Sequence, residues 1–537
     1  YNRTLQKLIS TNKMSRSAKR QKTNNGSSSS TTKEAFTTES LISNFQADEE
    51  LAETFIPIIG KLYRKCNVVT TLFGASLNNA STTDILRKHQ TQTDHRGRNV
   101  TVQETHKVLI AIARINGLKN LRCDLGQLLR VCEKTVESTA LDFNGAVEDE
   151  VAKSSRSVPN LENQMNVAKD IVLYGFGRIG RLLARELIRK TGSGGKMRLR
   201  GIVVRPPKNG PDLEKRSQLL LRDSVHGQFN CKCELDHEKN AMIINGNYIQ
   251  LIYGKSPDTI DYTKYGINNA LIVDNTGIWR DRKGLGLHLK SKGASNVLLT
   301  APAKDDIPNI VYGINEREFL SNKNETIFSA ASCTTNAVVP TIKLIDDNFG
   351  GIISGHLETV HAFTNDQNLI DNMHKKNRRG RSAPLNLVLT ETGAAKATIK
   401  CLPHLKGKLT ANAIRVPTPD VSMAIMVLNL GRETTKEEIN SFLRERATRG
   451  DLQQVLDFSD NKEAVSSDFV GNRAGCCVDG SSTSVIGSKV VLYCWYDNEF
   501  GYTCQVVRLM QALLNVSHPL CPLAKVTAPP PSVEDDQ

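Results

Sequence analysis

A glycine-rich turn at the end of one short apolar run constrains the fold of this chain more than any other sequence feature. The run Asp170–Tyr174 leads into Gly175, Gly177 and Gly180, and an amphipathic helical segment follows at once. In such a pattern the first glycine makes a tight turn, the second lets the backbone approach a diphosphate, and the third lets the helix pack closely on the strand. The free N–H groups of the helix N-terminus then face the phosphates. The pattern predicts a dinucleotide-binding unit of the Rossmann type.

The sequence after this unit contains two kinds of short apolar run. Runs without regular polar alternation, as in strands buried on both faces of a parallel sheet, occur at 199–205, 269–277 and 296–303. Runs that alternate polar and apolar side chains, as in a half-exposed antiparallel sheet, occur at 352–363, 421–430 and 490–496. The expected fold class is therefore an α/β Rossmann dinucleotide-binding domain plus an α+β catalytic domain with an antiparallel sheet.

These runs set the expected domain boundaries. The dinucleotide-binding domain is predicted over residues 168–332 and is completed by a C-terminal helix over 502–515. The catalytic domain is predicted over residues 333–498. At roughly 100–200 residues per domain, a chain of 537 residues has room for about one domain more.

The first third of the chain supplies that additional part. Apolar residues recur at helical spacing in 51–65, 102–116 and 121–136, and they predict a helical extension over residues 46–147. The polar residues 148–167 are expected to form a linker. No catalytic motif precedes this linker.

Both ends of the chain are expected to be disordered, over residues 1–45 and 516–537. Residues 1–33 carry eight basic residues and no acidic one, and the whole chain has a net charge of +14. A solvated tail is the favoured interpretation, and an organelle-targeting segment or a nucleic-acid-binding arm is the alternative. Because the first residue is Tyr1, we expect the natural start either upstream or at Met14.

Cysteine usage points to a reducing compartment. The twelve cysteines include no CxxC pair, and the close pairs Cys231/Cys233 and Cys476/Cys477 lack zinc-ligand partners at the usual spacings. We therefore expect no metal site and a cytoplasmic location, with organelle import left open. No apolar stretch approaches the roughly 20 residues of a membrane-spanning helix, so no membrane association is expected.

The second predicted strand bears on the choice of cofactor. A site specific for NAD usually ends this strand with a carboxylate that accepts a hydrogen bond from the ribose 2′-hydroxyl. Here the strand ends at Arg205, and no carboxylate occurs before Asp212. Since a positive charge suits a 2′-phosphate, NAD and NADP both remain open as cofactors.

One cysteine stands apart from the others. Cys333 lies among Ala, Ser and Thr residues directly before a helical segment, where the positive helix terminus favours a thiolate. His361 follows 28 positions later at the end of a predicted strand. A Cys–His pair of this kind could provide a nucleophile and a general base. Spacing alone leaves a structural role for both residues open.

Several longer motifs resolve that ambiguity through resemblance. YGFGRIGR, SCTTN, TVHAFTNDQ, TGAAK, KLTANAIRVPTPD and WYDNEFGY occur in this order between residues 169 and 514. The set resembles the phosphorylating glyceraldehyde-3-phosphate dehydrogenase family, in a long variety with an N-terminal helical extension. The resemblance covers roughly two thirds of the chain.

The resemblance implies a role for each matching residue. Cys333 is the implied nucleophile and His361 the residue that activates it. The implied cofactor-binding residues are Gly175, Gly177, Arg178, Ile179, Gly180, Arg205, Thr276, Gly277, Thr300, Asn498 and Tyr502. The implied inorganic-phosphate site comprises Ser332, Thr334, Arg381, Thr392 and Gly393, and the implied substrate-phosphate site comprises Thr364, Asp366 and Arg415.

The resemblance also implies a reaction and an assembly. The reaction is oxidation of glyceraldehyde 3-phosphate with inorganic phosphate to 1,3-bisphosphoglycerate, through a cysteine thioester and with NAD or NADP, in a homotetramer. Asn372 and Met373 stand where NAD-specific members commonly have Leu-Pro, which agrees with the missing carboxylate near Arg205.

Two other functions remain open at this stage. Erythrose-4-phosphate dehydrogenase would use much the same residues without phosphate as acceptor. A non-catalytic RNA-binding role would use the basic tail, although nucleic acid is not expected as the main partner.

Overall fold

The computed structural model describes residues 38–157 except His95, and residues 168–190, 197–322, 324–450 and 452–523. Residues 1–47 and 48–537 form two separate units. Of the first unit, residues 38–47 are described, and they begin helix α2 (Thr38–Cys66). All contacts given below lie within the second unit.

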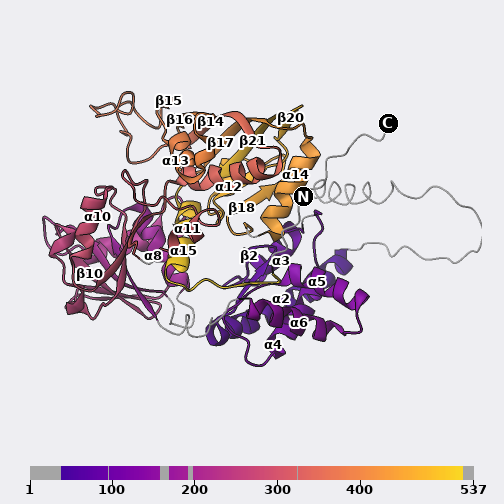
Figure 1. The fold of residues 1–537 in the computed structure, drawn as a ribbon. Helices are drawn as coiled ribbons and strands as arrows, with labels where there is room; N and C mark the ends of the chain where they lie inside the picture. The colour runs from indigo at the N-terminus through magenta and orange to yellow at the C-terminus, as the bar shows by residue number, and fades with distance from the viewer. Residues whose placement is uncertain are drawn as a thin grey trace, which may run out of the picture. The chain divides into compact units, whose positions relative to one another are not determined.

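The extension consists of helices around a small sheet (Figure 1). Its further elements are β1 (Val69–Leu72), β2 (Ala75–Ser76), α3 (Thr82–Thr91), α4 (Val102–Arg114), β3 (Arg122–Asp124), α5 (Leu125–Ser138) and α6 (Phe143–Arg156). Ser81 and Thr101 cap α3 and α4 through reciprocal capping boxes, which explains where these helices begin. Phe55, Ile112, Leu128 and Val147, from four different helices, share one buried core.

Two predicted boundaries are wrong at the ends of the extension. The linker was expected from residue 148, but α6 continues to Arg156 because Asp142 caps the helix and Val147 and Val151 bury its apolar face. The rest of that linker, residues 158–167, lies outside the described residues. The tail expected over 1–45 lies outside them up to residue 37, and residues 38–45 are helical.

The C-terminal segment also departs from its prediction. Residues 516–523 are ordered, and strand β22 (Leu520–Cys521) pairs in parallel with β3 of the extension. Val516 and Cys521 are 1% exposed, so burial of these two side chains stabilises a segment whose composition suggested disorder. Residues 524–537 lie outside the described part. The extension sheet thus has the order β2-β1-β3-β22.

The dinucleotide-binding domain is built on an eight-stranded sheet of order β13-β12-β11-β4-β5-β10-β9-β8. Its parallel strands are β4 (Lys169–Tyr174), β5 (Met197–Val204), β10 (Asn247–Tyr253), β11 (Ala270–Asp274), β12 (Ala294–Leu299) and β13 (Ile327–Ser329). Strands β8 (Cys233–Asp236) and β9 (Ala241–Ile244) extend it as antiparallel neighbours. The predicted Rossmann strands are confirmed, and strands β4 and β11 are buried along almost their whole length.

Helices pack on this sheet. They are α8 (Arg178–Lys190), α9 (Leu213–Leu221), α10 (Arg282–Leu289), α11 (Glu316–Leu320) and the C-terminal α15 (Phe500–Leu513). Leu183 of α8 and Val506 of α15 belong to one core with the strands, so α15 completes the domain. Short elements here are β6 (Arg222–Asp223), β7 (Gly227–Gln228), η1 (Pro257–Thr259) and η2 (Tyr262–Tyr265).

The catalytic domain contains a second sheet, of order β15-β16-β14-β17-β21-β19-β18, with β20 beside β21. Its strands are β14 (Ile352–Ala362), β15 (Val388–Thr390), β16 (Leu409–Val416), β17 (Ser422–Leu430), β18 (Leu456–Ser459), β19 (Cys476–Asp479), β20 (Ser484–Ile486) and β21 (Lys489–Tyr496). The predicted antiparallel pairing holds except for β14 with β16 and β18 with β19, which are parallel.

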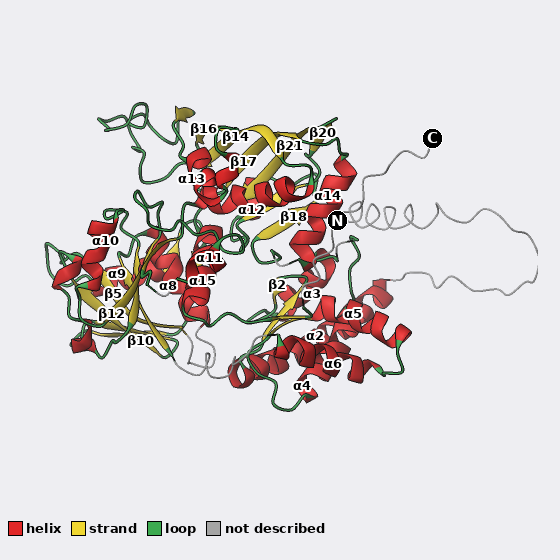
Figure 2. Ribbon diagram, in the orientation of Figure 1, coloured by secondary structure: helices red, strands yellow, loops and turns green. Residues whose placement is uncertain are grey.

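Three helices cover one face of this sheet (Figure 2). They are α12 (Cys333–Asn348), α13 (Ala394–Cys401) and α14 (Lys436–Arg449), and the 3-10 turns η3 (Pro403–Leu405) and η4 (Ser466–Phe469) complete the domain. Strand β17 alternates buried and partly exposed residues, as predicted for a sheet covered on one side. The core formed by Ile342, Phe442 and Leu428 fixes α12, and therefore its first residue, Cys333.

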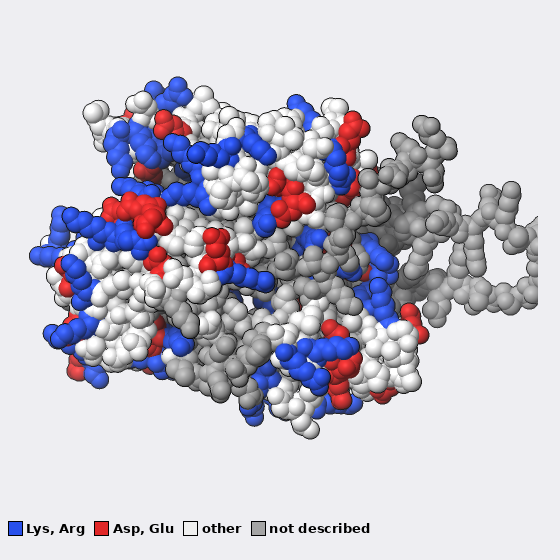
Figure 3. Space-filling view, in the orientation of Figure 1, with Lys and Arg blue, Asp and Glu red and all other residues white. Residues whose placement is uncertain are grey.

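Two surface properties follow from the described residues. Lys and Arg lie among Asp and Glu over most of the face shown in Figure 3. No helix in the described ranges is both long enough and apolar enough to cross a membrane.

Candidate active site

The glycine-rich turn has the geometry that its sequence pattern predicts. Gly175 has a φ of +99° and donates its N–H to Val203 O at 2.9 Å. A Cβ on Gly180 would lie 2.4 Å from Gly175 O, so the helix could not approach the strand with a larger residue. A Cβ on Gly177 would meet no atom within 4 Å, which leaves open space above the helix N-terminus. These residues therefore fit the diphosphate of a dinucleotide.

The ends of β11 and β12 border the same cradle. Asp274 Oδ1 accepts hydrogen bonds from both Thr276 N and Thr276 Oγ1 at 2.7 Å. Thr300 Oγ1 donates to Asp274 O at 3.1 Å, and Gly277 turns the chain with a φ of +65°. The buried Asp274 thus positions both predicted strand ends at the carboxyl edge of the sheet, where open α/β sheets bind ligands.

The two predicted arginines near the cofactor differ in their surroundings. Arg178 directs its side chain to Asp223, at 3.0 Å, and to Glu499, so only its backbone at the first turn of α8 is available to a cofactor. Ile179 packs on the domain core. Arg205 is exposed at the end of β5, and no ion pair or hydrogen bond joins it to another described residue. Asp212, the next carboxylate, is held by Arg216 and Tyr253.

Cys333 is the first residue of α12. The capping residue Ser332 accepts a hydrogen bond from Thr335 N at 3.1 Å, and Ala331 just before it has a φ of +55°. A positive φ in a residue other than glycine is a strained conformation that the surrounding structure must hold in place. Tyr502 does so by donating its hydroxyl to Ala331 O at 3.0 Å. The turn at Ala331 separates β13 from α12 and places Cys333 at the N-terminus of α12.

The predicted Cys–His pair is brought together. Cys333 Sγ lies 3.6 Å from His361 Nε2, at the end of β14. His361 Nδ1 lies 2.7 Å from Ala362 O and 2.9 Å from Arg415 Nη1, and Nε2 is the ring nitrogen that faces the thiol. Arg415 Nη1 donates to the same carbonyl at 2.9 Å. The ring is therefore oriented for taking a proton from Cys333.

The protonation states of this pair differ from those expected at a helix terminus. Burial raises the pKa of the Cys333 thiol above its usual range, and the charge of Arg415 opposes that rise only in part. Burial, followed by the charge of Arg415, lowers the pKa of His361 to about 3. The resting pair is thus a neutral thiol and a neutral imidazole. The thiolate forms when Nε2 accepts the thiol proton.

Hydrogen bonds fix the residues around the pair. Ser422 Oγ donates to Asn498 Oδ1 at 2.8 Å and accepts from Ala362 N at 3.1 Å. This leaves the Asn498 amide nitrogen to bind a carboxamide. Thr334 Oγ1 lies 3.1 Å from Tyr496 Oη. Ser422 and Tyr496 were missed by the sequence reasoning because they occupy ordinary alternating positions of β17 and β21.

The structure favours Arg379 over Arg381, the arginine that the sequence assigned to the inorganic-phosphate site. Arg381 lies on an exposed loop, its side chain 66% exposed, and it pairs with Asp371 at 2.8 Å. Arg379, two residues earlier, is buried and contacts Asp366, and its Nη2 donates to Thr390 Oγ1 at 3.0 Å. The charge of Arg379 also contributes to the lowered pKa of His361, after burial and the charge of Arg415.

The other predicted phosphate residues lie on loops at two element ends. Thr364 follows β14, and Thr392 and Gly393 precede α13. Thr392 Oγ1 accepts a hydrogen bond from Ala394 N at 3.2 Å, just before the N-cap residue Gly393, and keeps its hydroxyl proton for a ligand. The basic groups of Arg379 and Arg415, with a helix N-terminus, form surroundings suited to phosphate.

A second polar cluster joins the two domains below this site. His226 Nε2 lies 3.1 Å from both Asp420 Oδ2 and Asp497 Oδ2. The atoms of these three side chains that could ligate a metal ion all lie within 4.8 Å of one another, and they form the one such group of His, Cys, Asp and Glu among the described residues. Burial lowers the pKa of His226, but the two aspartates outweigh it and raise that pKa to about 10. A protonated histidine therefore bridges two carboxylates.

This cluster should make stability depend on pH in the alkaline range. The pKa of His226 in the folded protein, about 10, lies above its ordinary value, so its contribution is fully present below about pH 6.5 and is lost as the pH rises through 10. His226→Gln should lower the free energy of unfolding by about 3 kcal/mol at pH 7. Calorimetry should show the difference in Tm from the wild type shrinking toward zero near pH 10. A difference that stays constant with pH, or an equal effect of the exposed His237→Gln, would contradict this role.

Comparison with known protein families agrees with this geometry. Residues 169–282 match the family model of the glyceraldehyde 3-phosphate dehydrogenase NAD binding domain, and residues 332–498 match that of its C-terminal domain. A glyceraldehyde-3-phosphate dehydrogenase-like protein of Pseudomonas aeruginosa is 52% identical over 472 residues, which cover 87% of this chain and 100% of that protein. Since only 369 residues follow residue 168, the match includes about a hundred residues of the extension.

Shorter relatives match the enzyme domains alone. Glyceraldehyde-3-phosphate dehydrogenase 1 of Bacillus subtilis is 38% identical over 64% of this chain and 97% of its own length. The chloroplastic glyceraldehyde-3-phosphate dehydrogenase GAPA1 of Arabidopsis thaliana is 38% identical over 64% of this chain and 83% of its own. The Cys–His pair, the dinucleotide cradle and both family domains agree, and the chain belongs to the glyceraldehyde 3-phosphate dehydrogenase family of NAD(P)-binding oxidoreductases.

Proposed function

We propose that the chain oxidises glyceraldehyde 3-phosphate with inorganic phosphate to 1,3-bisphosphoglycerate, with NAD or NADP as the hydride acceptor. The observation that carries this proposal is the Cys333–His361 pair, 3.6 Å apart and beside the charges of Arg379 and Arg415. A nucleophile near basic groups can hold both a phosphorylated aldehyde and the inorganic phosphate that accepts the acyl group.

The chain's residues have defined tasks in this reaction. His361 Nε2 takes the thiol proton, Cys333 Sγ adds to the aldehyde carbon, and His361 returns the proton to the resulting oxyanion to give a hemithioacetal. A nicotinamide held by Asn498 and the glycine-rich turn would supply the hydride acceptor for that carbon. Loss of the hydroxyl proton to His361 leaves a thioester on Cys333. Phosphate held near Arg379 and the N-terminus of α13 then attacks the thioester, and the acyl phosphate leaves as the thiolate is restored.

Steady-state kinetics tests this reaction. Glyceraldehyde 3-phosphate should be oxidised continuously only when phosphate is present, and hydroxylamine should trap the acyl phosphate product as a hydroxamate. A higher kcat/KM for erythrose 4-phosphate, with turnover independent of phosphate, would contradict the proposed substrate and acceptor.

The cofactor preference has a specific test at Arg205. Its exposed guanidinium at the end of β5 is positioned as a partner for a ribose 2′-phosphate, and no carboxylate there enforces NAD. Arg205→Ala should lower kcat/KM for NADP about tenfold or more and change the value for NAD less than twofold. Kinetics with both cofactors measures this. A wild-type preference for NAD above about a hundredfold, or equal losses with both cofactors, would refute use of NADP.

A homotetramer is part of the same proposal. The loop between β14 and β15 exposes Ile370 (78%), Met373 (93%), Leu385 (80%) and Leu387 (71%). Several large apolar side chains exposed on one loop are typical of a protein interface. Sedimentation equilibrium of the full chain should give four chains per particle, and Ile370→Asp with Leu387→Asp should shift it to smaller species.

A further inference from the structure

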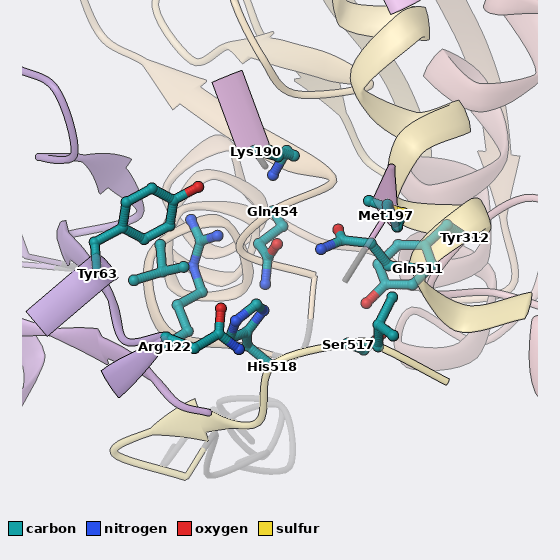
Figure 4. A pocket seen from close by; sticks show the side chains of 12 residues that line it. Tyr63, Arg122, Lys190, Met197, Tyr312, Gln454, Gln511, Ser517 and His518 are labelled. Atoms are coloured by element: carbon teal, nitrogen blue, oxygen red, sulfur yellow. The ribbon is translucent and has the colours of Figure 1, made fainter. Parts of the chain in front are cut away.

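A polar pocket lies where the extension meets both enzyme domains. It is lined by Tyr63 and Arg122 of the extension, Lys190 at the end of α8, Gln454 before β18 and Gln511 of α15. Its cavity volume is about 50 Å³. Figure 4 shows the polar ends of Arg122, Gln454 and Gln511 turned toward one space. We call this the junction pocket.

Contacts around the junction pocket hold the three parts of the second unit together. Tyr63 Oη donates to Arg189 O at 3.2 Å, and Arg122 N donates to Pro519 O at 2.9 Å. Gln127 Nε2 donates to Thr448 O at 2.8 Å. The pocket is therefore built from elements that are distant in sequence and fixed against one another.

Positive charge gathers at the junction pocket. Arg122 and Lys190 line it, and Arg473 and Arg508 lie close enough behind them to act on the pKa of Lys190. Burial lowers the pKa of Lys190 to about 8; Glu186 opposes this shift, and the three guanidinium groups reinforce it. Burial, followed by the charge of Arg508, lowers the pKa of Arg122 to about 10. The four cations thus repel one another in a partly desolvated space.

The nearby carboxylates do not neutralise this charge. Glu186 pairs with Arg473 and lies 3.7 Å from Lys190 Nζ, so one carboxylate serves two cations. Asp124 is already used: its oxygens accept hydrogen bonds from Thr71 Oγ1, Phe73 N, Gly74 N and Gln127 N.

Arg122 and Arg508 have carbonyl partners only. Arg122 Nη2 donates to Gly74 O at 3.2 Å, and Arg508 Nη1 donates to Arg473 O at 2.9 Å. Within the described residues, no ion pair joins either guanidinium to a carboxylate. Uncompensated charge in low-dielectric surroundings is costly, and an anion would relieve it.

We propose that the junction pocket binds a phosphate group, either as inorganic phosphate or on a small phosphate ester, between Arg122 and Lys190. Arginine provides a planar pair of N–H donors for phosphate oxygens, and lysine adds a compact charge. The side-chain amides of Gln454 and Gln511 supply further donors at the pocket wall. A bound anion links the extension to both enzyme domains and stabilises their assembly by mass action.

Equilibrium dialysis of the full chain with radiolabelled inorganic phosphate, at constant ionic strength set by sodium chloride, tests this site. The chain should have two classes of phosphate site, one in the active site and one in the junction pocket. Arg122→Gln and Lys190→Gln should each raise the Kd of the junction class about tenfold or more. Arg114→Gln removes the same charge from an exposed position of the extension and should bind as the wild type does. The kcat of aldehyde oxidation at saturating phosphate should stay within about twofold of wild type in all three variants.

The active site also binds phosphate under the proposed function, and Arg379→Gln separates the two sites. This variant should lose the catalytic phosphate and retain the class of binding that depends on Arg122. If Arg122→Gln fails to fold, the phosphate binding of Lys190→Gln tests the junction pocket. The Lys190 side chain is 30% exposed, so this variant should fold. Unchanged phosphate binding in Lys190→Gln, or equal competition by chloride, would overturn the junction site.

Competition with phenyl phosphate distinguishes the two sources of the ligand. Labelled phosphate bound at the site that depends on Arg122 is displaced by each competitor in turn. If phenyl phosphate displaces it at a lower concentration than unlabelled inorganic phosphate does, the ligand is a phosphate ester. Displacement by inorganic phosphate alone identifies the free ion.

Discussion

Replacing Cys333 with serine should reduce kcat/KM for aldehyde oxidation by at least about 10⁴-fold, since covalent nucleophiles of this kind carry nearly all of the chemical step. The physical reason is the proton that must leave. An ordinary thiol has a pKa near 8.5, and although burial raises the pKa of the Cys333 thiol, an alcohol is a far weaker acid still. His361 can take the first proton across 3.6 Å but not the second. The measurement is the initial rate of NADH or NADPH formation at varied aldehyde concentrations.

The matched control is Cys231→Ser, a half-buried cysteine of the dinucleotide-binding domain that no step of the reaction uses. Its activity should equal that of the wild type. His361→Asn should fall about 10²- to 10⁴-fold, because it removes the base and keeps the nucleophile. A Cys333→Ser enzyme with more than a few per cent of wild-type activity would refute the assignment of the nucleophile.

The second large effect separates two arginines that are two residues apart. Arg379→Gln should lower kcat/KM about a hundredfold, because it removes a charge-assisted donor proposed to hold phosphate and leaves Asp366 with only its weaker contact to Lys376, at 3.4 Å, and to His374. Arg381→Gln should lie within about twofold of wild type, since Arg381 pairs with Asp371 on the exposed loop. Arg379→Lys keeps the charge without the planar fork and should be intermediate.

Kinetics at varied phosphate and varied aldehyde measures this pair of variants, and the Tm of each variant controls for folding. Activity lost in Arg381→Gln and kept in Arg379→Gln would show that the exposed arginine moves into the site, contrary to the structure.

The sequence predicted the enzyme domains well because their patterns are local. The turn at Gly175–Gly180 joins adjacent elements, and the buried strands β4 and β11 contain uninterrupted runs without charged residues, over 171–174 and 270–273. The extension was harder. Its strands β1, β2 and β3 have two to four residues, too few for a periodic pattern. The pairing of β22 with β3 joins segments about 400 residues apart, which local composition cannot indicate.

The same distinction explains the outcome at the site. Motif order identified Cys333 and His361, and the structure places them in contact. In the run Arg378–Arg381, however, the residue types are alike on both sides of a turn, and only the backbone decides which arginine points inward. Arg378 has a φ of +68°, and the chain after it buries Arg379 and exposes Arg381.

A rapid-mixing experiment tests the central claim, that Cys333 holds an acyl thioester which phosphate resolves. Without phosphate, the enzyme mixed with glyceraldehyde 3-phosphate and cofactor should release one NADH or NADPH per active subunit in a burst and then stop. Mass spectrometry should locate the acyl group on Cys333, and added phosphate should restart turnover. Sustained turnover without phosphate, or an acyl group on another residue, would contradict this mechanism.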